Sequence, residues 1–395
     1  MDTDANVRHI VGWRDVFRLI KEDSSINFIA VAISPWHALS VDATIAYMQA
    51  QGITLRGVIC CAEHYDTGWA IDESYFLAKC CKKYSIPAHH EPFAKYDSKW
   101  DRQINNLQEY KYVLWDWMNW QNKPLLYYIC PNRPDFQLLM QMKMAGRYVQ
   151  CIAYDEGVAT YMTTLQPKPN PIKSIRDLWL RRHYIRQHIF GNKVRSFLHK
   201  DKNTFLFNRT SKGLEVNDYI LPYYREIFSQ RYAMLYGKKV LDISHAIVIC
   251  TTAWQRDKIK NNEDLKVLIR VCKKLRNEGY RLFLKTHPRD VFFTEHAKEI
   301  GAEVLDVPEM SMELLCVKTQ PLAIIGYSST TLVVPYVFWK IPGICLTNLL
   351  KRDNLGESYR EEIDSFKSVF SNVVTYVNND VQLCDFLEGV KNENV

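Results

Sequence analysis

Residues 27–35 read NFIAVAISP, and this stretch decides the class of fold. The apolar run Asn27–Ile33 predicts a buried strand, and Ser34-Pro35 then supplies a helix N-cap followed by proline at the first helical position. The helix is expected to run to about Gln51 and to end at Gly52. A short apolar strand that leads directly into a helix is the repeating unit of a parallel sheet with helices on both faces.

The same alternation extends in both directions along the chain. In the N-terminal part we expect strands at Leu55–Ala62, Pro124–Ile129 and Tyr148–Tyr154, and helices over Asp72–Tyr84 and Asp135–Ala145. The alternation breaks after Thr164 and returns after residue 240. There we expect strands at Ala246–Cys250, Arg281–Lys285, Ala302–Val307, Leu322–Ile325 and Gly343–Leu346. A helix is expected over Asn262–Glu278, and helical patterns occur around Ser365–Phe370 and Val381–Val390.

These patterns predict an α/β, GT-B-like architecture of two Rossmann-like domains with a cleft between them. The expected divisions are an N-terminal acceptor-side domain over 1–164, a basic insertion and linker over 165–240, a nucleotide-donor domain over 241–360, and C-terminal helices over 361–395. Periplasmic binding proteins and some epimerases share this outline, so the fold class alone does not select a reaction.

Composition favours a cytoplasmic globular protein. The chain has 395 residues, 47% of them hydrophobic, which is enough for two large cores. Its 11 cysteines are odd in number, include two adjacent pairs and form no CxxC, so free thiols are expected. The first 23 residues lack the apolar segment of a signal peptide, and no apolar run approaches a membrane span.

Three short motifs follow predicted strands, where open α/β sheets bind ligands. The first is Asp155-Glu156-Gly157, in which a carboxylate could accept the proton of an acceptor hydroxyl, although Asp and Gly also favour ordinary turns. The second is Lys285-Thr286-His287-Pro288-Arg289, whose imidazole and cations suit an anionic leaving group. A loop histidine bonded to a backbone carbonyl is the alternative.

The third motif runs from Gly326 to Thr331 and contains Ser328, Ser329 and Thr330. A strand, a small polar turn and a helix N-terminus together make an anion site, because free N–H groups and hydroxyls converge there. An ordinary N-cap is the alternative. A base in the first half of the chain and phosphate-binding groups in the second are what glycosyl transfer from a nucleotide requires.

In this order the acid-acid-Gly, His-Pro and Ser-Ser motifs resemble those of bacterial sialyltransferases of the lipooligosaccharide sialyltransferase and polysialyltransferase type. The resemblance implies a GT-B enzyme that moves a sialic, pseudaminic or legionaminic acid from a CMP-sugar to a capsule or lipopolysaccharide glycan, with inversion and with neither metal nor cofactor. It also implies that Asp155 is the general base, with Glu156 as the rival, and that His287 assists departure of the CMP phosphate. Ser328 and Ser329 would hold that phosphate, with Lys285, Pro288, Arg289, Gly326 and Thr330 as further donor-side candidates.

A basic segment lies between the two halves. Residues 166–202 carry ten Lys and Arg against two Asp, a net +8 in a chain whose total is +7. Arg181, Arg182 and Arg186 stand among apolar residues at near-helical spacing, which favours peripheral contact with an anionic inner membrane and a lipid-linked acceptor. A groove for an anionic acceptor and a solvated helix surface are the alternatives. No nucleic-acid module is recognisable.

Two further functions remain open at this stage. His-Pro and Ser-Ser motifs also occur in Kdo transferases and CDP-glycerol-dependent transferases of surface polymers. The first alternative is therefore a transferase of one of these two kinds. The second is a non-catalytic glycan- or nucleotide-binding protein of the same fold.

Overall fold

The computed structural model describes residues 13–62, 71, 73–86, 124–131, 142, 146–162, 203–210, 213–236, 242–252, 258–287, 290, 292–305, 307 and 310–393. Within these ranges the chain forms two compact units. Unit 1 contains the residues up to Glu156, then 203–206 and Pro222–Ile227. Unit 2 contains 157–162, Phe207–Leu221 and the residues from Phe228 onward.

Unit 1 is built on a six-stranded sheet in the order β3-β2-β1-β4-β5-β6, in which every pairing is parallel. This is the strand order of a Rossmann fold. The strands are β1 (Phe28–Ala32), β2 (Gly57–Ala62), β3 (Cys81–Ile86), β4 (Leu125–Pro131), β5 (Tyr148–Tyr154) and β6 (Asn203–Thr204).

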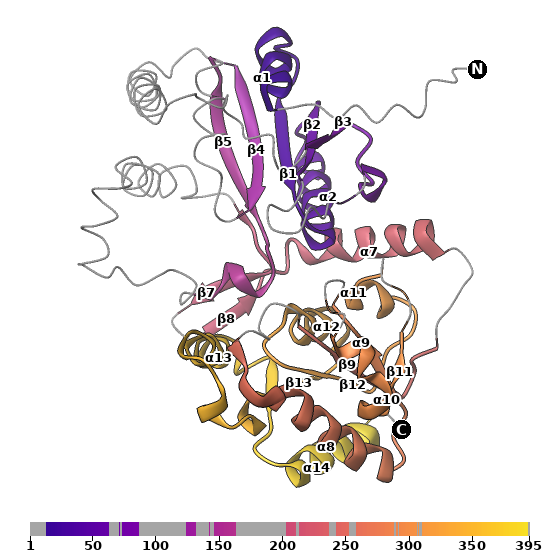
Figure 1. Ribbon diagram of the computed structural model, residues 1–395. Helices are drawn as coiled ribbons and strands as arrows, with labels where there is room; N and C mark the ends of the chain where they lie inside the picture. The colour runs from indigo at the N-terminus through magenta and orange to yellow at the C-terminus, as the bar shows by residue number, and fades with distance from the viewer. Residues whose placement is uncertain are drawn as a thin grey trace, which may run out of the picture. The chain divides into compact units, whose positions relative to one another are not determined.

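Helices cover both faces of this sheet (Figure 1). Helix α1 (Trp13–Glu22) places Val16 and Ile20, four residues apart, in one apolar core with the odd-numbered side chains of β1. Helix α2 (Pro35–Ala50) packs into the core of the opposite face. Ser34 caps α2 by accepting a hydrogen bond from the His37 N–H at 3.2 Å.

Unit 2 repeats the arrangement, with the parallel order β11-β10-β9-β12-β13-β14. Its strands are β9 (Ile247–Cys250), β10 (Leu282–Lys285), β11 (Glu303–Val304), β12 (Ala323–Gly326), β13 (Gly343–Cys345) and β14 (Val374–Tyr376). Its helices include α8 (Glu263–Asn277), α9 (Phe292–Glu295), α10 (Ala297–Ile300), α11 (Met312–Leu315), α12 (Val334–Trp339), α13 (Glu357–Phe370) and α14 (Asp380–Glu393). A hairpin of β7 (Phe207–Thr210) and β8 (Gly213–Val216) also belongs to this unit.

The two parallel sheets confirm the predicted α/β class with two Rossmann-like units. The strands expected from apolar runs are present, within a few residues of the expected ends. Helix α7 (Leu221–Tyr236), the β7–β8 hairpin and the edge strand β14 were not predicted. No helix in the described ranges is long and apolar enough to cross a bilayer.

The helix predicted over Asp72–Tyr84 is wrong. Only a 3-10 turn, Glu73–Tyr75, forms there, and strand β3 begins at Cys81. The side chain of Asp42 on α2 accepts the N–H groups of Leu77 and Ala78 at 2.8 and 3.1 Å, which fixes this segment in a non-helical path before it pairs with β2. The helix predicted over Asp135–Ala145 lies outside the described residues except at Met142.

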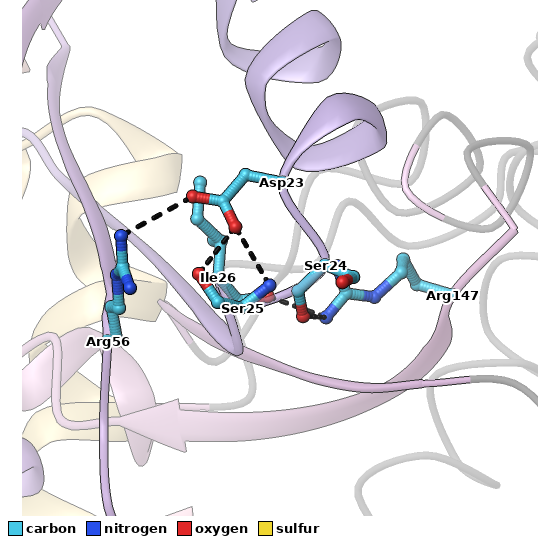
Figure 2. Close-up of polar contacts among 6 residues, drawn as sticks. All are labelled: Asp23, Ser24, Ser25, Ile26, Arg56 and Arg147. Atoms are coloured by element: carbon cyan, nitrogen blue, oxygen red, sulfur yellow. Dashed lines mark hydrogen bonds and ion pairs between the residues drawn. The ribbon is translucent and has the colours of Figure 1, made fainter.

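A buried arginine joins the start of unit 1 to its sheet (Figure 2). The Arg147 guanidinium is 4% exposed and donates to backbone carbonyls that end α1, lead into β1 and begin β4. The acceptors are the carbonyl oxygens of Ile20, Ser24, Ile26, Pro124 and Leu125, at 2.5 to 3.4 Å. One side chain thus satisfies several acceptors that the turn between α1 and β1 leaves without a helical or ladder partner.

Replacing Arg147 with Met should destabilise the protein by ~3 kcal/mol, because buried carbonyls lose charge-assisted donors. Urea unfolding followed by circular dichroism measures this change. Arg270→Met removes an exposed arginine paired with Asp380 and serves as the control, with an expected loss below ~1 kcal/mol. Equal stability of the two variants would contradict this role for Arg147.

Candidate active site

The carboxyl edge of the unit 2 sheet brings two of the predicted motifs together. In the ladder Cys250 of β9 is the partner of Lys285 in β10 and also of Gly326 in β12. His287 and Ser328 therefore each lie two residues beyond this line, just past the ends of the two strands that flank β9. Neighbouring strands lie ~4.8 Å apart, so the two segments leave the sheet about 10 Å from each other. The first strand of such a sheet, where the order reverses, is where doubly wound folds bind ligands.

The loop that carries His287 is held by a buried carboxylate. Asp290 is 6% exposed and accepts the Thr251 hydroxyl at 2.5 Å and the Phe293 N–H at 3.2 Å. Thr251 Oγ1 in turn accepts the His287 N–H at 3.2 Å, and the His287 carbonyl accepts the Asp290 N–H at 2.8 Å. The backbone on both sides of the imidazole is thereby tied to β9 and to α9, while the ring is only partly buried.

Lys285 lies below this loop as the last residue of β10 and is 8% exposed. It is close enough to Glu313 on α11 for its charge to affect that carboxyl. Burial raises the pKa of Glu313, and the Ser311 hydroxyl and the Lys285 ammonium act in the opposite direction. Lys285 thus contributes positive charge beneath the edge.

The Ser-Ser motif begins in the core and ends at the surface. Gly326 stands where an added Cβ would be 2.7 Å from the Cys250 carbonyl oxygen, so glycine is required by strand packing. Ser328 is 2% exposed and donates to Glu362 Oε1 on α13 at 3.4 Å, and the other oxygen of Glu362 faces Lys258 Nζ at 3.9 Å. Ser329, which is more exposed, caps the following 3-10 turn by accepting the Thr331 N–H at 3.3 Å.

Thr330 receives the segment that directly follows the acid pair. Gly157 and Val158 belong to unit 2, and the Val158 N–H donates to Thr330 Oγ1 at 3.2 Å. Gly157 has φ of +87°, and a Cβ added there would be 2.5 Å from the same oxygen. Only glycine fits, for two independent reasons.

Asp155 lies in unit 1, directly after β5, and is 0% exposed. Its Oδ2 accepts the Leu206 N–H at 3.1 Å, and its carbonyl accepts the Ser40 hydroxyl at 3.0 Å. Ser40 Oγ also accepts the Tyr224 hydroxyl at 2.9 Å. Burial raises the pKa of Tyr224, and the nearby charge of Asp155 raises it further, so this phenol stays protonated as a donor.

Glu156 is more exposed than Asp155 and lies near Tyr154. Burial raises the pKa of Tyr154, and the Glu156 charge adds to the effect. The ring of His37, at the start of α2, is 5.3 Å from the Tyr154 ring, and its Nδ1 accepts the Ile33 N–H at 3.3 Å. The carboxyl edge of unit 1 therefore carries a histidine as well as the two acids.

Some predicted residues are not described, and some important ones were not predicted. Pro288, Arg289, Arg181, Arg182 and Arg186 lie outside the described ranges. The structure adds Thr251, Asp290 and Glu362 as residues that fix His287 and Ser328. Of these, only Asp290 had a usable sequence signal, because an aspartate three residues before Phe293 has the spacing of a helix cap. In the described part of the chain, no three His, Cys, Asp or Glu side chains gather as a metal site would require.

Comparison with protein families shows which family the chain belongs to. Residues 68–348 match the model of the family described as Alpha-2,8-polysialyltransferase (POLYST). The chain belongs to the alpha-2,8-polysialyltransferase family. The match covers more than half of the sequence and confirms the predicted family, and the positions of the three motifs fall within the matched range. The protein is accordingly a CMP-sugar-dependent, sialyltransferase-like glycosyltransferase, with a CMP-sugar donor and a glycan acceptor.

Solved structures of several transferases and of an epimerase are similar to this polysialyltransferase-family chain. The UDP-GlcNAc 2-epimerase from Methanocaldococcus jannaschii has 12% identity, a TM-score of 0.49, and coverage of 92% of this chain and 91% of that one. The alpha/beta-galactoside alpha-2,3-sialyltransferase from Photobacterium phosphoreum has 11% identity, a TM-score of 0.44, and coverage of 88% and 97%. The E. coli heptosyltransferase WaaC with ADP has 12% identity, a TM-score of 0.42, and coverage of 93% of this chain and 100% of that one. No curated protein sequence matches the chain.

The close approach of Gly157 to Thr330 should make this glycine indispensable. Gly157→Ala should lower stability by about 1–3 kcal/mol, since alanine is strained at positive φ and its methyl meets Thr330. Thermal unfolding measures the loss, and Gly157→Ala with Thr330→Ala should recover only the steric part. Gly52→Ala is the matched control, because Gly52 has positive φ but open space around its Cα. An equal loss of stability in Gly157→Ala and Gly52→Ala would show that the contact with Thr330 adds no steric cost.

Proposed function

We propose that the protein is an inverting, metal-independent transferase that moves a nonulosonic acid of the sialic acid type from its CMP donor to a capsule or lipopolysaccharide glycan. The single observation that carries the proposal is the joint placement of His287 and Ser328 just beyond the strands that flank β9, in a chain of the polysialyltransferase family. Family membership favours this donor over the Kdo and CDP-glycerol alternatives.

The leaving group is a phosphate, and its departure needs positive charge and hydrogen-bond donors in place before reaction. In this proposal His287 donates to the CMP phosphate from a loop that Asp290 holds at both ends. The more exposed Ser329 supplies a hydroxyl donor, while Glu362 holds Ser328 in place and Lys285 contributes buried positive charge beneath. Because these groups need no reorganisation during the reaction, they can supply the stabilisation that a metal ion provides elsewhere.

The acceptor hydroxyl needs a base, which we assign to Asp155. The Leu206 N–H donates to one carboxylate oxygen and so holds the side chain in one orientation. Glu156 directly precedes Gly157 in the chain. The acid pair is therefore joined directly to the residue that contacts Thr330. Glu156 is the alternative base, because it is the more exposed of the two acids.

Asp155→Asn should reduce sialyl transfer by ~100-fold or more, because the acceptor proton then has no base. The amide keeps an oxygen for the Leu206 N–H, so folding should be preserved. Hydrolysis of the CMP-sugar without acceptor needs leaving-group assistance and should change little. Transfer is followed by product chromatography, and hydrolysis by release of CMP.

Two comparison variants make this test specific. Glu156→Gln should keep transfer within about tenfold of the native protein, since a neighbouring carboxylate is not the base. His287→Ala should reduce transfer and donor hydrolysis together, because it removes help to the shared leaving group. If Glu156→Gln lost transfer while Asp155→Asn retained it, the base would be Glu156.

Metal independence gives a separate prediction. Turnover of CMP-N-acetylneuraminate should be unchanged by EDTA, since the protein's own donors stabilise the phosphate. CMP-pseudaminate, CMP-Kdo and CDP-glycerol, tested in parallel, define the donor. Loss of turnover with EDTA that magnesium or manganese restores would overturn metal independence. Saturable CMP binding without turnover of any donor would indicate a non-catalytic binding protein.

We further propose that the acceptor is reached from the cytoplasmic face of the inner membrane, with segment 166–202 in peripheral contact with anionic lipid or a lipid-linked acceptor. The net +8 of this segment is the support, because anionic leaflets attract clustered Lys and Arg.

A further inference from the structure

A pocket opens in unit 2 beside the carboxyl ends of β13 and β14. Its volume is about 230 Å³. In the ladder Cys345 of β13 is the partner of Gly326 in β12 and of Tyr376 in β14. Thr347 and Asn378, which line the pocket, each lie two residues beyond this line. The pocket therefore lies along the same sheet edge as the Ser-Ser motif.

One side of α13 forms a long wall of the pocket. Four of its residues recur at spacings of three and four along this helix, so their side chains share one side of it. They are Arg360, Ile363, Asp364 and Lys367. Glu362, which accepts the Ser328 hydroxyl, stands on nearly the opposite side, because successive residues of a helix turn by ~100°. The pocket and the Ser328 contact are thus on different sides of α13.

The pocket carries more positive than negative charge. Its ionisable side chains are Arg352, Arg360 and Lys367 against the single carboxylate of Asp364. Arg352 donates to both oxygens of Asp364, at 3.2 and 2.8 Å, so these two charges offset each other. The Arg360 side chain, which is half-buried, forms no hydrogen bond or ion pair with another residue of the described ranges. Arg360 and Lys367 therefore remain to attract an anion.

The charged groups lie close together around Asp364. The hydrogen bond from Arg352 lowers the pKa of Asp364 despite some burial, and the charges of Lys367 and Arg360 act in the same direction. Asp364 therefore stays ionised at neutral pH and can only accept hydrogen bonds.

Neutral groups complete the lining. Lys367 Nζ donates to Asn348 Oδ1 at 3.4 Å and lies 5.5 Å from the centre of the Tyr376 ring. Asn348 Nδ2 donates to Asn378 Oδ1 at 2.9 Å. Each amide keeps further hydrogen-bonding capacity, because an amide has two N–H donors and an oxygen with two lone pairs. The apolar part of the lining consists of Leu350, Leu355 and Ile363.

The carboxylate of Asp364 selects among anions. A phosphate monoester carries up to two negative charges at neutral pH and offers few donors, so Asp364 repels it. A sugar carboxylate carries one charge, and the hydroxyls of the same sugar can donate to Asp364. Two cations, hydrogen-bonding amides and an apolar surface in a small pocket suit one acidic sugar residue.

We propose that this pocket binds one carboxylate-bearing sugar residue of the glycan, at a place separate from the CMP-sugar. Arg360 and Lys367 attract the sugar carboxylate. Asp364, Asn348 and Asn378 bind its hydroxyl and amide groups. The inference rests on the proposed function only for the acidic character of the glycan. Because the pocket and the Ser328 contact lie on different sides of α13, the bound residue is not the one being transferred.

The test measures binding of an α2,8-linked tetramer of N-acetylneuraminic acid to the full chain, by isothermal titration calorimetry without a CMP-sugar. We expect saturable binding that weakens as salt is added. The neutral tetramer, in which each carboxyl group has been reduced to an alcohol, should bind ~5-fold or more weakly. Inorganic phosphate at the tetramer's concentration should not displace it. CMP affinity is measured in the same way.

A matched pair of double variants locates the binding. Arg360→Gln with Lys367→Gln should weaken tetramer binding ~5-fold or more, because it removes both cations that attract the carboxylate. Lys266→Gln with Lys273→Gln removes the same charge at the same seven-residue spacing from the exposed side of α8, and should weaken binding less than ~2-fold. Neither variant should change CMP affinity. Thermal unfolding verifies that both are folded.

Each other outcome contradicts a specific part of the inference. Equal weakening by the two double variants overturns the site, and equal binding of the neutral tetramer overturns the role of the carboxylate. Displacement by phosphate overturns the ligand class. A loss of CMP affinity in the pocket variant overturns the separation from the CMP-sugar. A protein that turns over a CMP-sugar without binding the tetramer overturns this inference and leaves the proposed function intact, whereas tetramer binding at this pocket without turnover does the reverse.

Discussion

Parallel pairing of β9 with β10 on one side and β12 on the other is the constraint on which the edge that carries His287 and Ser328 depends. Because the carboxyl ends of parallel strands meet at the same edge, residues 41 positions apart in sequence, His287 and Ser328, leave the sheet on either side of one central strand. The four-residue β9 is apolar and buried and ends in Cys250, yet its register with both neighbours determines where the imidazole and the hydroxyls can be. The chemistry of this edge is a consequence of strand order.

Fixed positions at this edge also require rigid attachments, and the structure provides them through buried polar groups. Asp290 ties the His287 loop to Thr251 and to the start of α9, and Glu362 on α13 accepts the Ser328 hydroxyl. In unit 1 Asp155 is similarly bonded through both its backbone and its carboxylate. Each of these bonds would leave a buried group unsatisfied if broken, which makes it costly to move the loop. Rigid donors of this kind stabilise developing charge without the energetic cost of reorganisation.

The extent to which the sequence predicted this structure follows from how each signal arises. The run Ala246–Cys250 is apolar throughout, and Tyr148–Tyr154 is apolar except at Gln150, because both sheet faces are covered, so their strands and the motifs after them were predictable. The helix predicted over 72–84 is wrong, because the local pattern suits a helix while the side chain of Asp42, 35 residues before Leu77, binds the backbone N–H groups of Leu77 and Ala78. Strand β14 has three residues and no periodicity. Thr251 and Asp290 are 39 positions apart, so their shared hydrogen bond has no signature in either neighbourhood.

The two adjacent cysteine pairs show why residue type and spacing alone underdetermine chemistry. In the sequence Cys60-Cys61 and Cys80-Cys81 are the same dipeptide. Inside β2 the pleat sends the two thiols into different cores, where each is a small hydrophobic side chain with no access to a reagent. At the start of β3 both thiols are only partly buried and pack beside the core that α2 covers. An adjacent pair at the start of a strand is therefore placed differently from the same pair inside a strand. The same reasoning applies to His287 and Ser328, whose chemistry depends on lying just beyond their strands and not within them.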